Sequence, residues 1–316
     1  MCMNKEFEKI CRMSQKSLKN HVKQRLQVTH GKAVVENGFV YAQGKFPVLL
    51  VAHMDTVHKV LPSTIVYDNT GDIISSPQGI GGDDRCGVYM IFEILKRINC
   101  SVLFTEDEEK GGIGADKFAK SDLLEELDFN YIIEFDRANA NDAVFYSCAN
   151  DEFEEFVTQD FYKTNYGSYS DICEIAPALG CAAVNLSCGY HNAHTTNEYV
   201  VFSEMEASIE AACKILERTT ESDKFEYVED MSSSFGYYGK NYSYSGGYSN
   251  YSYTGAESYY AQKYYIIEYV NVYGANEYYD TYARSKAEAV GHFVMDKSDM
   301  TYDNVVDVCS QDLYDY

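Results

Sequence analysis

The sequence lacks tryptophan, has only four prolines and contains no long apolar run. No stretch approaches the roughly 20 apolar residues that a membrane-spanning helix needs. The N-terminal residues carry charges where an export signal would need its apolar core. The ten cysteines are scattered without CxxC spacing, so we interpret them as reduced thiols. These absences lead us to expect a cytoplasmic protein without a membrane partner.

Positive charge is also scarce, since 26 Lys and Arg face 49 Asp and Glu, giving a net charge of −23 at pH 7. A surface of this sign would repel the phosphates of nucleic acid, so we expect no nucleic-acid partner. The N-terminal residues 1–46 are an exception and are basic. Over 4–26 their lysines lie between apolar residues at helical spacing, which predicts a surface helix covering the edge of a sheet.

The chain of 316 residues is long enough for one substantial core and a small second unit. Asn37 and Gly38 join two short β runs and predict a hairpin. Further along, apolar β-forming runs alternate with stretches of helical periodicity. We expect strands at 47–53, 100–105, 131–135 and 181–186, and helices at 88–97, 114–127 and 203–219. This alternation predicts an α/β fold, with a mostly parallel mixed sheet sandwiched by helices in three layers, α/β/α.

The composition changes near residue 225, and residues 225–262 are rich in Tyr, Gly and Ser with almost no aliphatic side chains. Such a composition is typical of a flexible linker, and its tyrosines could support self-association. We therefore divide the chain into an α/β domain, a linker and a small α+β appendage, at 1–224, 225–262 and 263–316. The appendage is expected to resemble a βαβ unit, with a strand, a helix and a strand at 264–273, 285–294 and 304–309.

Polar residues follow the expected strands directly, at the edge where ligands gather in open α/β sheets. His53 and Asp55 end the strand 47–53 and would project in the same direction, which suits an imidazole oriented by a carboxylate. Later stretches place further acids and a histidine at strand ends or in tight loops: Asp83, Asp84, Glu108, Glu109, Asp136 and His194. Each of these short motifs is common by chance. Their order along the chain is what indicates a shared site.

Carboxylates and imidazoles together suit zinc or a related divalent ion. Two metal ions about 3.5–4 Å apart need a bridging carboxylate and about five ligands in all. One glutamate must stay free to act as general base. The adjacent Glu108 and Glu109 could provide one general base and one metal ligand. The pattern therefore predicts a hydrolytic site with two metal ions.

The ordered segments Ala52–Thr56, Gly81–Gly87, Thr105–Gly111, Glu134–Asp136 and His194–Glu198 resemble the co-catalytic zinc peptidases of the MH clan, families M20, M28 and M42. The resemblance covers about residues 45–220 and is nearest the tripeptide-aminopeptidase branch of M20. Those relatives in M20 and M42 insert an extra domain between two of these segments. The present spacings leave no room for one, so the layout resembles that of M28 and indicates a catalytic domain without a lid.

The resemblance implies a ligand set for two zinc ions. Asp83 would bridge both ions, His53 and Asp136 would complete one site, and Glu109 and His194 would complete the other. His191 lies only three residues before His194 and is expected to line the mouth of the site instead.

The resemblance also implies two roles beside the metals. Glu108 would be the general base that takes a proton from the attacking water, and Asp55 would orient His53. The implied activity is hydrolysis of an amide bond, most closely by an aminopeptidase on short peptides. An N-acyl amino-acid deacylase and a non-catalytic binding protein on the same fold stay open as alternatives. The loop 167–171 lies where relatives keep a segment near the substrate, and it would line the pocket or form an ordinary turn.

Overall fold

The computed structural model describes residues 3–229, 263–272, 274–283, 289–290, 293–294, 297, 300–301 and 304–311. The chain forms two compact units, Met1–Val228 and Glu229–Tyr316, which we call unit 1 and unit 2. Among the described helices, none combines the length and the apolar character needed to cross a bilayer.

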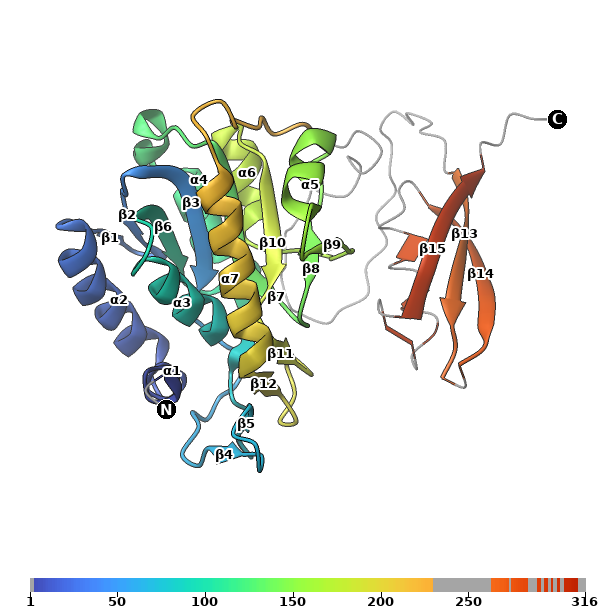
Figure 1. Cartoon of the computed structure of the whole chain (residues 1–316), viewed down its shortest axis with the longest axis horizontal. Helices are drawn as coiled ribbons and strands as arrows, with labels where there is room; N and C mark the ends of the chain where they lie inside the picture. The colour runs from blue at the N-terminus through green and yellow to red at the C-terminus, as the bar shows by residue number, and fades with distance from the viewer. Residues whose placement is uncertain are drawn as a thin grey trace, which may run out of the picture. The chain divides into compact units, whose positions relative to one another are not determined.

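Unit 1 is built on an eight-stranded sheet with the order β1-β2-β6-β3-β7-β10-β8-β9 (Figure 1). In that order the strands are β1 Val34–Glu36, β2 Phe39–Ala42, β6 Cys100–Thr105, β3 Phe46–His53, β7 Tyr131–Arg137, β10 Ala183–Ser187, β8 Asp142–Val144 and β9 Lys163–Thr164. The four central strands β6, β3, β7 and β10 are parallel, so their carboxyl ends meet at one edge. The predicted mixed, mostly parallel sheet is confirmed, and β1 and β2 form the hairpin predicted at Asn37 and Gly38.

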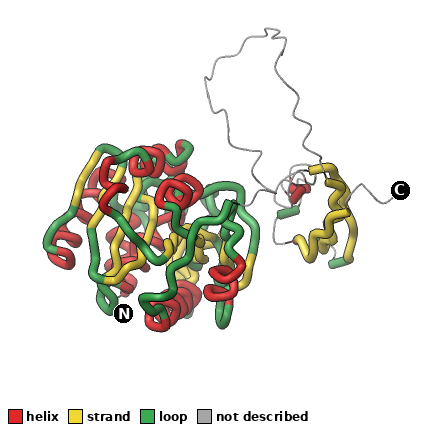
Figure 2. Tube along the Cα trace, turned by 90° about the horizontal axis from the view of Figure 1, so that it is seen from above, coloured by secondary structure: helices red, strands yellow, loops and turns green. Residues whose placement is uncertain are grey.

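Helices lie on both sides of the sheet of unit 1 (Figure 2). The helix α3 packs on β3 and β7 and contacts α1 and α7, whereas α4 and α6 pack on each other and on β2, β7 and β10. The helices are α1 Met3–Cys11, α2 Gln15–His30, α3 Gly82–Ile94, α4 Ile113–Ala119, α5 Asp151–Thr158, α6 Ile172–Leu179 and α7 Phe202–Arg218, with short 3-10 turns η1 Glu108–Lys110 and η2 Asp122–Glu126. This arrangement gives the three predicted layers.

The single helix predicted over 4–26 is wrong, because the chain forms α1 and α2 instead. Ser14 begins α2, and its side chain accepts a hydrogen bond from the backbone N–H of Ser17 at 3.2 Å. Serine is a favoured N-cap because it satisfies a backbone donor that a new helix leaves unpaired. The apolar periodicity continues across this break, so periodicity alone does not reveal it.

A second, four-stranded sheet in unit 1 has the order β11-β12-β5-β4. Its strands are β11 Tyr190–His191, β12 Tyr199–Val201, β5 Ile73–Ser75 and β4 Val66–Tyr67. The pairing of β12 with β5 brings the loop 192–198, which carries His194, next to the glycine-rich segment that follows β5. This small sheet therefore sets the position of one side of the candidate site.

Gly87 allows α3 to approach β7 closely. A Cβ atom at this position would overlap the carbonyl oxygen of Phe135 and would lie 2.5 Å from Oδ2 of Asp84. The backbone N–H of Gly87 donates to Oδ1 of Asp84 at 2.7 Å. The absence of a side chain therefore helps to fix the first turn of α3, which carries Asp83.

Gly87→Ala is expected to lower the free energy of unfolding by about 3 kcal/mol, because a backbone oxygen cannot move aside as a flexible side chain can. Gly180→Ala is the matched control. Gly180 has φ +63° and nothing within 4 Å of a Cβ atom, so only backbone strain of about 1 kcal/mol is expected. Chemical denaturation measures both, and equal losses in the two variants would contradict the packing argument.

Unit 2 contains a three-stranded sheet of order β14-β13-β15, with β13 Lys263–Val270, β14 Asn276–Ala283 and β15 Val305–Gln311. Both pairings are antiparallel, so the predicted βαβ arrangement is wrong, since it would make β13 and β15 parallel. Between β13 and β14, the backbone N–H of Asn271 donates to the carbonyl oxygen of Ala275, the N–H of Gly274 donates to that of Asn271, and Gly274 has φ +79°. Of the predicted helix 285–294, residues 289–290 and 293–294 are described and are helical. Most of the predicted linker 225–262 lies outside the described residues.

Candidate metal centre

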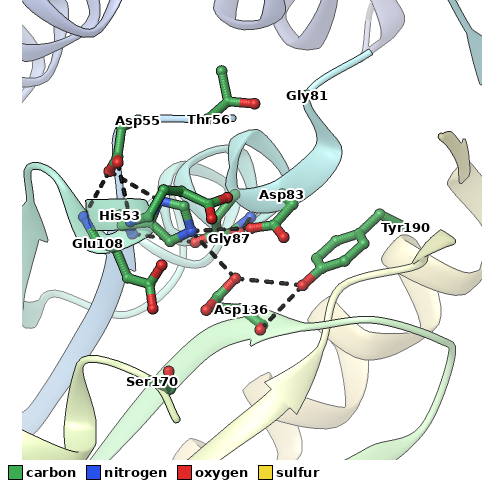
Figure 3. A network of polar contacts seen from close by, with 12 residues as sticks. His53, Asp55, Thr56, Gly81, Asp83, Gly87, Glu108, Asp136, Ser170 and Tyr190 are labelled. Atoms are coloured by element: carbon green, nitrogen blue, oxygen red, sulfur yellow. Dashed lines mark hydrogen bonds and ion pairs between the residues drawn. The ribbon is translucent and has the colours of Figure 1, made fainter. Parts of the chain in front are cut away.

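The carboxyl ends of β3, β6 and β7 and the first turn of α3 meet at one place (Figure 3). His53 ends β3, Asp136 lies near the end of β7, and Asp83 opens α3. Glu108 and Glu109 lie in η1, just beyond β6. The strand-end residues that the sequence indicated are therefore neighbours in the fold.

Asp83 lies at the middle of this cluster. Its Oδ1 is 3.0 Å from Nε2 of His53, and its Oδ2 is 3.0 Å from Nε2 of His194. Two groups of possible ligands share it, His53–Asp83–Asp136 and Asp83–Glu109–His194, with the ligand atoms of each group within 4.8 Å of one another. One carboxylate thus faces two separate coordination positions through different oxygens. The peptide bond between Asp83 and Asp84 is cis.

The first group is almost entirely enclosed. His53 is fully buried, and Oδ1 of Asp136 lies 3.4 Å from its Nε2. The hydroxyl of Tyr190 donates to the backbone oxygen of Asp136 at 3.1 Å, and the Oδ1 of Asp136 lies 3.4 Å away (Figure 3). Tyr190 therefore orients a candidate ligand, a role that the sequence did not indicate.

The second group opens to solvent. The His194 side chain is 55% exposed, and its φ of +63° places it in the left-handed region that few side chains adopt. Glu109 Oε1 is buried and lies 3.1 Å from Nε2 of His194, its ion-pair partner. Apart from this histidine, no described residue donates a hydrogen bond to it, and a cation would satisfy such an oxygen.

Asp55 connects the first group to the turn that carries the two glutamates. Its Oδ1 lies 3.2 Å from Nδ1 of His53 and accepts from the backbone N–H of Glu108 at 3.0 Å. Its Oδ2 accepts from the N–H of Glu109 at 3.2 Å. The predicted contact between Asp55 and His53 is present, and Asp55 also fixes the position of η1.

Burial and like charges shift the ionisation of the cluster. Burial raises the pKa of Glu108 to about 9, and the charges of Asp136 and Asp171 act in the same direction against that of His53. Burial and the charge of Asp83 raise the pKa of Asp136 to about 7. So many buried carboxylates can stay ionised together only beside positive charge.

In this structure, His53 and His194 supply that positive charge. Burial by itself would raise the pKa of Asp83, but hydrogen bonds from His194 and His53 hold it well below its usual range. The contacts with Asp83 and Glu109 raise the pKa of His194 to about 11. Two divalent cations would provide the same compensation, and the set of carboxylate and imidazole donors suits zinc. The residues therefore fit a pair of metal ions.

The last two residues of the loop 167–171 pack into the interior near the cluster. Ser170 and Asp171 are fully buried. The Ser170 hydroxyl donates to Glu134, and the hydroxyl of Thr105 donates to Asp171. These contacts make the end of the loop a structural turn, and a role in lining the pocket for residues 167–169 stays a prediction.

Comparison with known proteins agrees with this geometry. Residues 40–177 match the family model described as peptidase family M28. Over this segment, which is less than half of the chain, the protein is similar to M28 peptidases. It is a metal-dependent hydrolase, and M28 peptidases typically use co-catalytic metal ions. The match also agrees with the layout without an inserted lid that the sequence spacings indicated. No protein of curated function matches the sequence.

Several solved aminopeptidase structures share the fold. Aminopeptidase PepT from Bacillus cereus is 14% identical, with 68% of this chain and 97% of that chain covered and a TM-score of 0.56. A TET aminopeptidase from a marine-sediment Thaumarchaeota archaeon is 13% identical, with 71% and 99% covered and a TM-score of 0.56. Aminopeptidase APDkam598 from Desulfurococcus kamchatkensis is 15% identical, with 68% and 94% covered and a TM-score of 0.53. At these identities the likeness shows the fold.

His191 and His194, both in the 190–198 region, have different partners in the structure. His194 faces Asp83 and Glu109, whereas Nε2 of His191 lies 2.6 Å from Oε2 of Glu204 and its ring stacks on Tyr199 at 4.9 Å. His194→Ala is therefore expected to lower bound zinc from about two ions per chain to about one, because one group loses its only imidazole.

His191→Ala should leave the zinc content unchanged, so it serves as the control. Mass spectrometry of metal content, on proteins dialysed in parallel against zinc, measures both variants. An equal loss of zinc in both, or no loss in either, would contradict the placement of His194.

Proposed function

We propose that this protein is an M28-like aminopeptidase that uses two zinc ions to cleave short peptides. The observation that carries the proposal is the Asp83 carboxylate, whose two oxygens face His53 and His194 separately at 3.0 Å. A shared carboxylate flanked by two further ligands on each side is the arrangement that a two-metal hydrolase needs.

Two zinc ions held by these residues would polarise the scissile carbonyl and make a water between them acidic. Glu108 belongs to neither of the two groups that share Asp83, yet its carboxylate lies within 4.8 Å of ligand atoms of His53 and Glu109. It is therefore free to take a proton from the attacking water and pass it to the leaving amine. Asp55 contacts both His53 and the backbone of η1. These contacts fix the position of Glu108 relative to the candidate metal ligands.

The preference for a peptide with a free amino group rests on two observations. The second group is the accessible one, since His194 is 55% exposed, and a substrate can approach from that side. The similar solved structures are described as aminopeptidases. An N-acyl amino-acid deacylase would use the same ligands, so the substrate panel must separate the two activities.

The test is hydrolysis by the metal-free and zinc-loaded protein. A chelator is expected to lower the cleavage of a free tripeptide by at least about 100-fold and to lower Tm, because bound ligands stabilise the native state. Zinc or cobalt should restore both. The N-acetylated form of the same tripeptide and a set of N-acyl amino acids are the comparison substrates. Faster cleavage of the N-acyl substrates would replace the aminopeptidase with a deacylase, and an activity insensitive to chelation would contradict the metal mechanism.

We also propose a cytoplasmic location and no membrane or nucleic-acid partner. The eight cysteines from Cys11 to Cys213 are free thiols, as is usual in a reducing compartment, and the net charge of −23 opposes binding to phosphates. Self-association through the Tyr-rich segment stays a proposal based on composition. Light scattering of the full chain over a range of concentrations tests it.

A further inference from the structure

We propose that Glu198 is the positioning residue that holds the shared ligand Asp83 in place between the two metal positions. The inference rests on the proposed two-metal function. Glu198 is in none of the candidate ligand groups, and it contacts Asp83 through the backbone N–H, so its effect would be exerted through the backbone of Asp83.

The Glu198 side chain is fully buried and bound at both oxygens. Oε1 accepts from the backbone N–H of Asp83 at 3.0 Å, and Oε2 accepts from the N–H of Gly81 at 2.8 Å. Oε2 also lies 2.8 Å from Nε2 of His58. Hydrogen bonds to a charged acceptor in a buried place are among the stronger ones, so this carboxylate defines where the Gly81–Asp83 backbone can lie.

These contacts join three parts of the site. His58 follows the strand that ends in His53, the Gly81–Asp83 segment carries the shared ligand, and Glu198 is four residues after His194. One buried carboxylate therefore ties together the segments that carry a ligand of the first group, the shared ligand and a ligand of the second group.

The start of α3 needs such an acceptor. Asp83 has φ −80° and ψ 105°, outside the helical region, and the first N–H groups of a helix have no partner inside the helix. Glu198 accepts the hydrogen bond from the N–H of Asp83, and its negative charge is favourable at a helix N-terminus.

Close packing leaves the segment little freedom to move. A Cβ atom on Gly82 would lie 2.8 Å from side-chain atoms of Tyr190 and Val200, and one on Gly79 would overlap the ring of His58. The glycines thus let the loop pass between Glu198, His58 and the small sheet. Losing the Glu198 charge weakens the acceptor for the N–H groups of Gly81 and Asp83, so the Asp83 carboxylate should shift relative to both groups.

The experiment is a titration of metal-free full-length protein with cobalt(II), followed by visible absorption, for wild type and Glu198→Gln. Wild type should bind two cobalt ions. Glu198→Gln should bind the second ion about 10- to 100-fold more weakly, the usual effect of losing a partner that orients a ligand. Its cobalt spectrum should also differ, since the geometry around Asp83 changes.

Glu204→Gln is the matched control. Glu204 pairs with His191 at 2.6 Å, so it is also a carboxylate bound to a histidine near the loop 192–198, but it contacts no candidate ligand. Its two cobalt affinities and its spectrum should equal those of wild type. If Glu198→Gln fails to fold, His58→Ala takes its place, with a smaller weakening of the second ion expected.

The outcomes separate this inference from the proposed function. Wild-type cobalt affinities and spectrum in Glu198→Gln would overturn the inference even if its Tm falls, because Glu198 would then be merely structural. Failure of wild type to bind two cobalt ions would instead overturn the two-metal function. Weaker binding and a changed spectrum in Glu198→Gln alone would support the positioning role.

Discussion

Glu108→Gln is expected to lower kcat for tripeptide hydrolysis by about 1000-fold or more while leaving both metal ions bound. The substitution keeps the shape of the side chain but removes its ability to take up a proton, and general-base catalysis typically contributes about 100- to 10,000-fold. The metal content should stay unchanged, because Glu108 is in neither of the two groups that share Asp83. Steady-state kinetics and metal analysis on the same preparation measure both quantities.

Asp107→Asn is a suitable control for this variant. Asp107 precedes Glu108, has φ +61°, which asparagine also tolerates, and pairs with Lys110 at 2.7 Å. Its activity should stay close to that of wild type. A Glu108→Gln protein that retains more than about one tenth of the activity would show that another group accepts the proton.

Asp83→Ala is expected to abolish detectable hydrolysis and to reduce bound zinc from about two ions per chain to less than one. The loss should exceed that of any other single ligand, because Asp83 belongs to both groups. Each remaining half-site would keep only one carboxylate and one imidazole, fewer than the three protein ligands of a catalytic zinc site. Metal analysis after dialysis against zinc measures the loss.

Asp116→Ala is the control for the loss of an acid. Asp116 lies on α4, and its 47% exposed side chain pairs with Lys120. Its zinc content and activity should match those of wild type. Two zinc ions retained in Asp83→Ala would mean that the shared carboxylate is not the bridge.

The candidate ligands could be predicted because their signals are local. His53 directly ends an apolar strand, and Glu109 and Asp136 lie at or just beyond the ends of two others. Parallel strands bring such ends to one edge whatever the details of packing. The shared position of Asp83 followed from the resemblance to known peptidases, and the structure places it between His53 and His194.

The residues that support these ligands could not be predicted, because their contacts join distant parts of the chain. Glu198 reaches Gly81 across 117 positions, and Tyr190 reaches Asp136 across 54. Such contacts depend on the pairing of β12 with β5, which periodicity does not encode. The last residue of the His194–Glu198 motif was visible in the sequence, but its buried acceptor role was not.

The strand β14 was missed for a related reason. Its sequence, Asn276–Ala283, mixes acids and tyrosines without a run of aliphatic residues. The segment is a strand because it pairs with β13. The break between α1 and α2 depends on one N-cap, Ser14. In both cases the local sequence pattern fits more than one secondary structure, and a turn or a helix cap determines which one forms.

The most direct test of the two-metal account is anomalous X-ray diffraction from crystals grown with zinc. Two anomalous peaks are expected about 3.5–4 Å apart, one beside His53 and Asp136 and the other beside Glu109 and His194, with the Asp83 carboxylate between them. A single peak, or two peaks that do not share Asp83, would contradict the two-metal account.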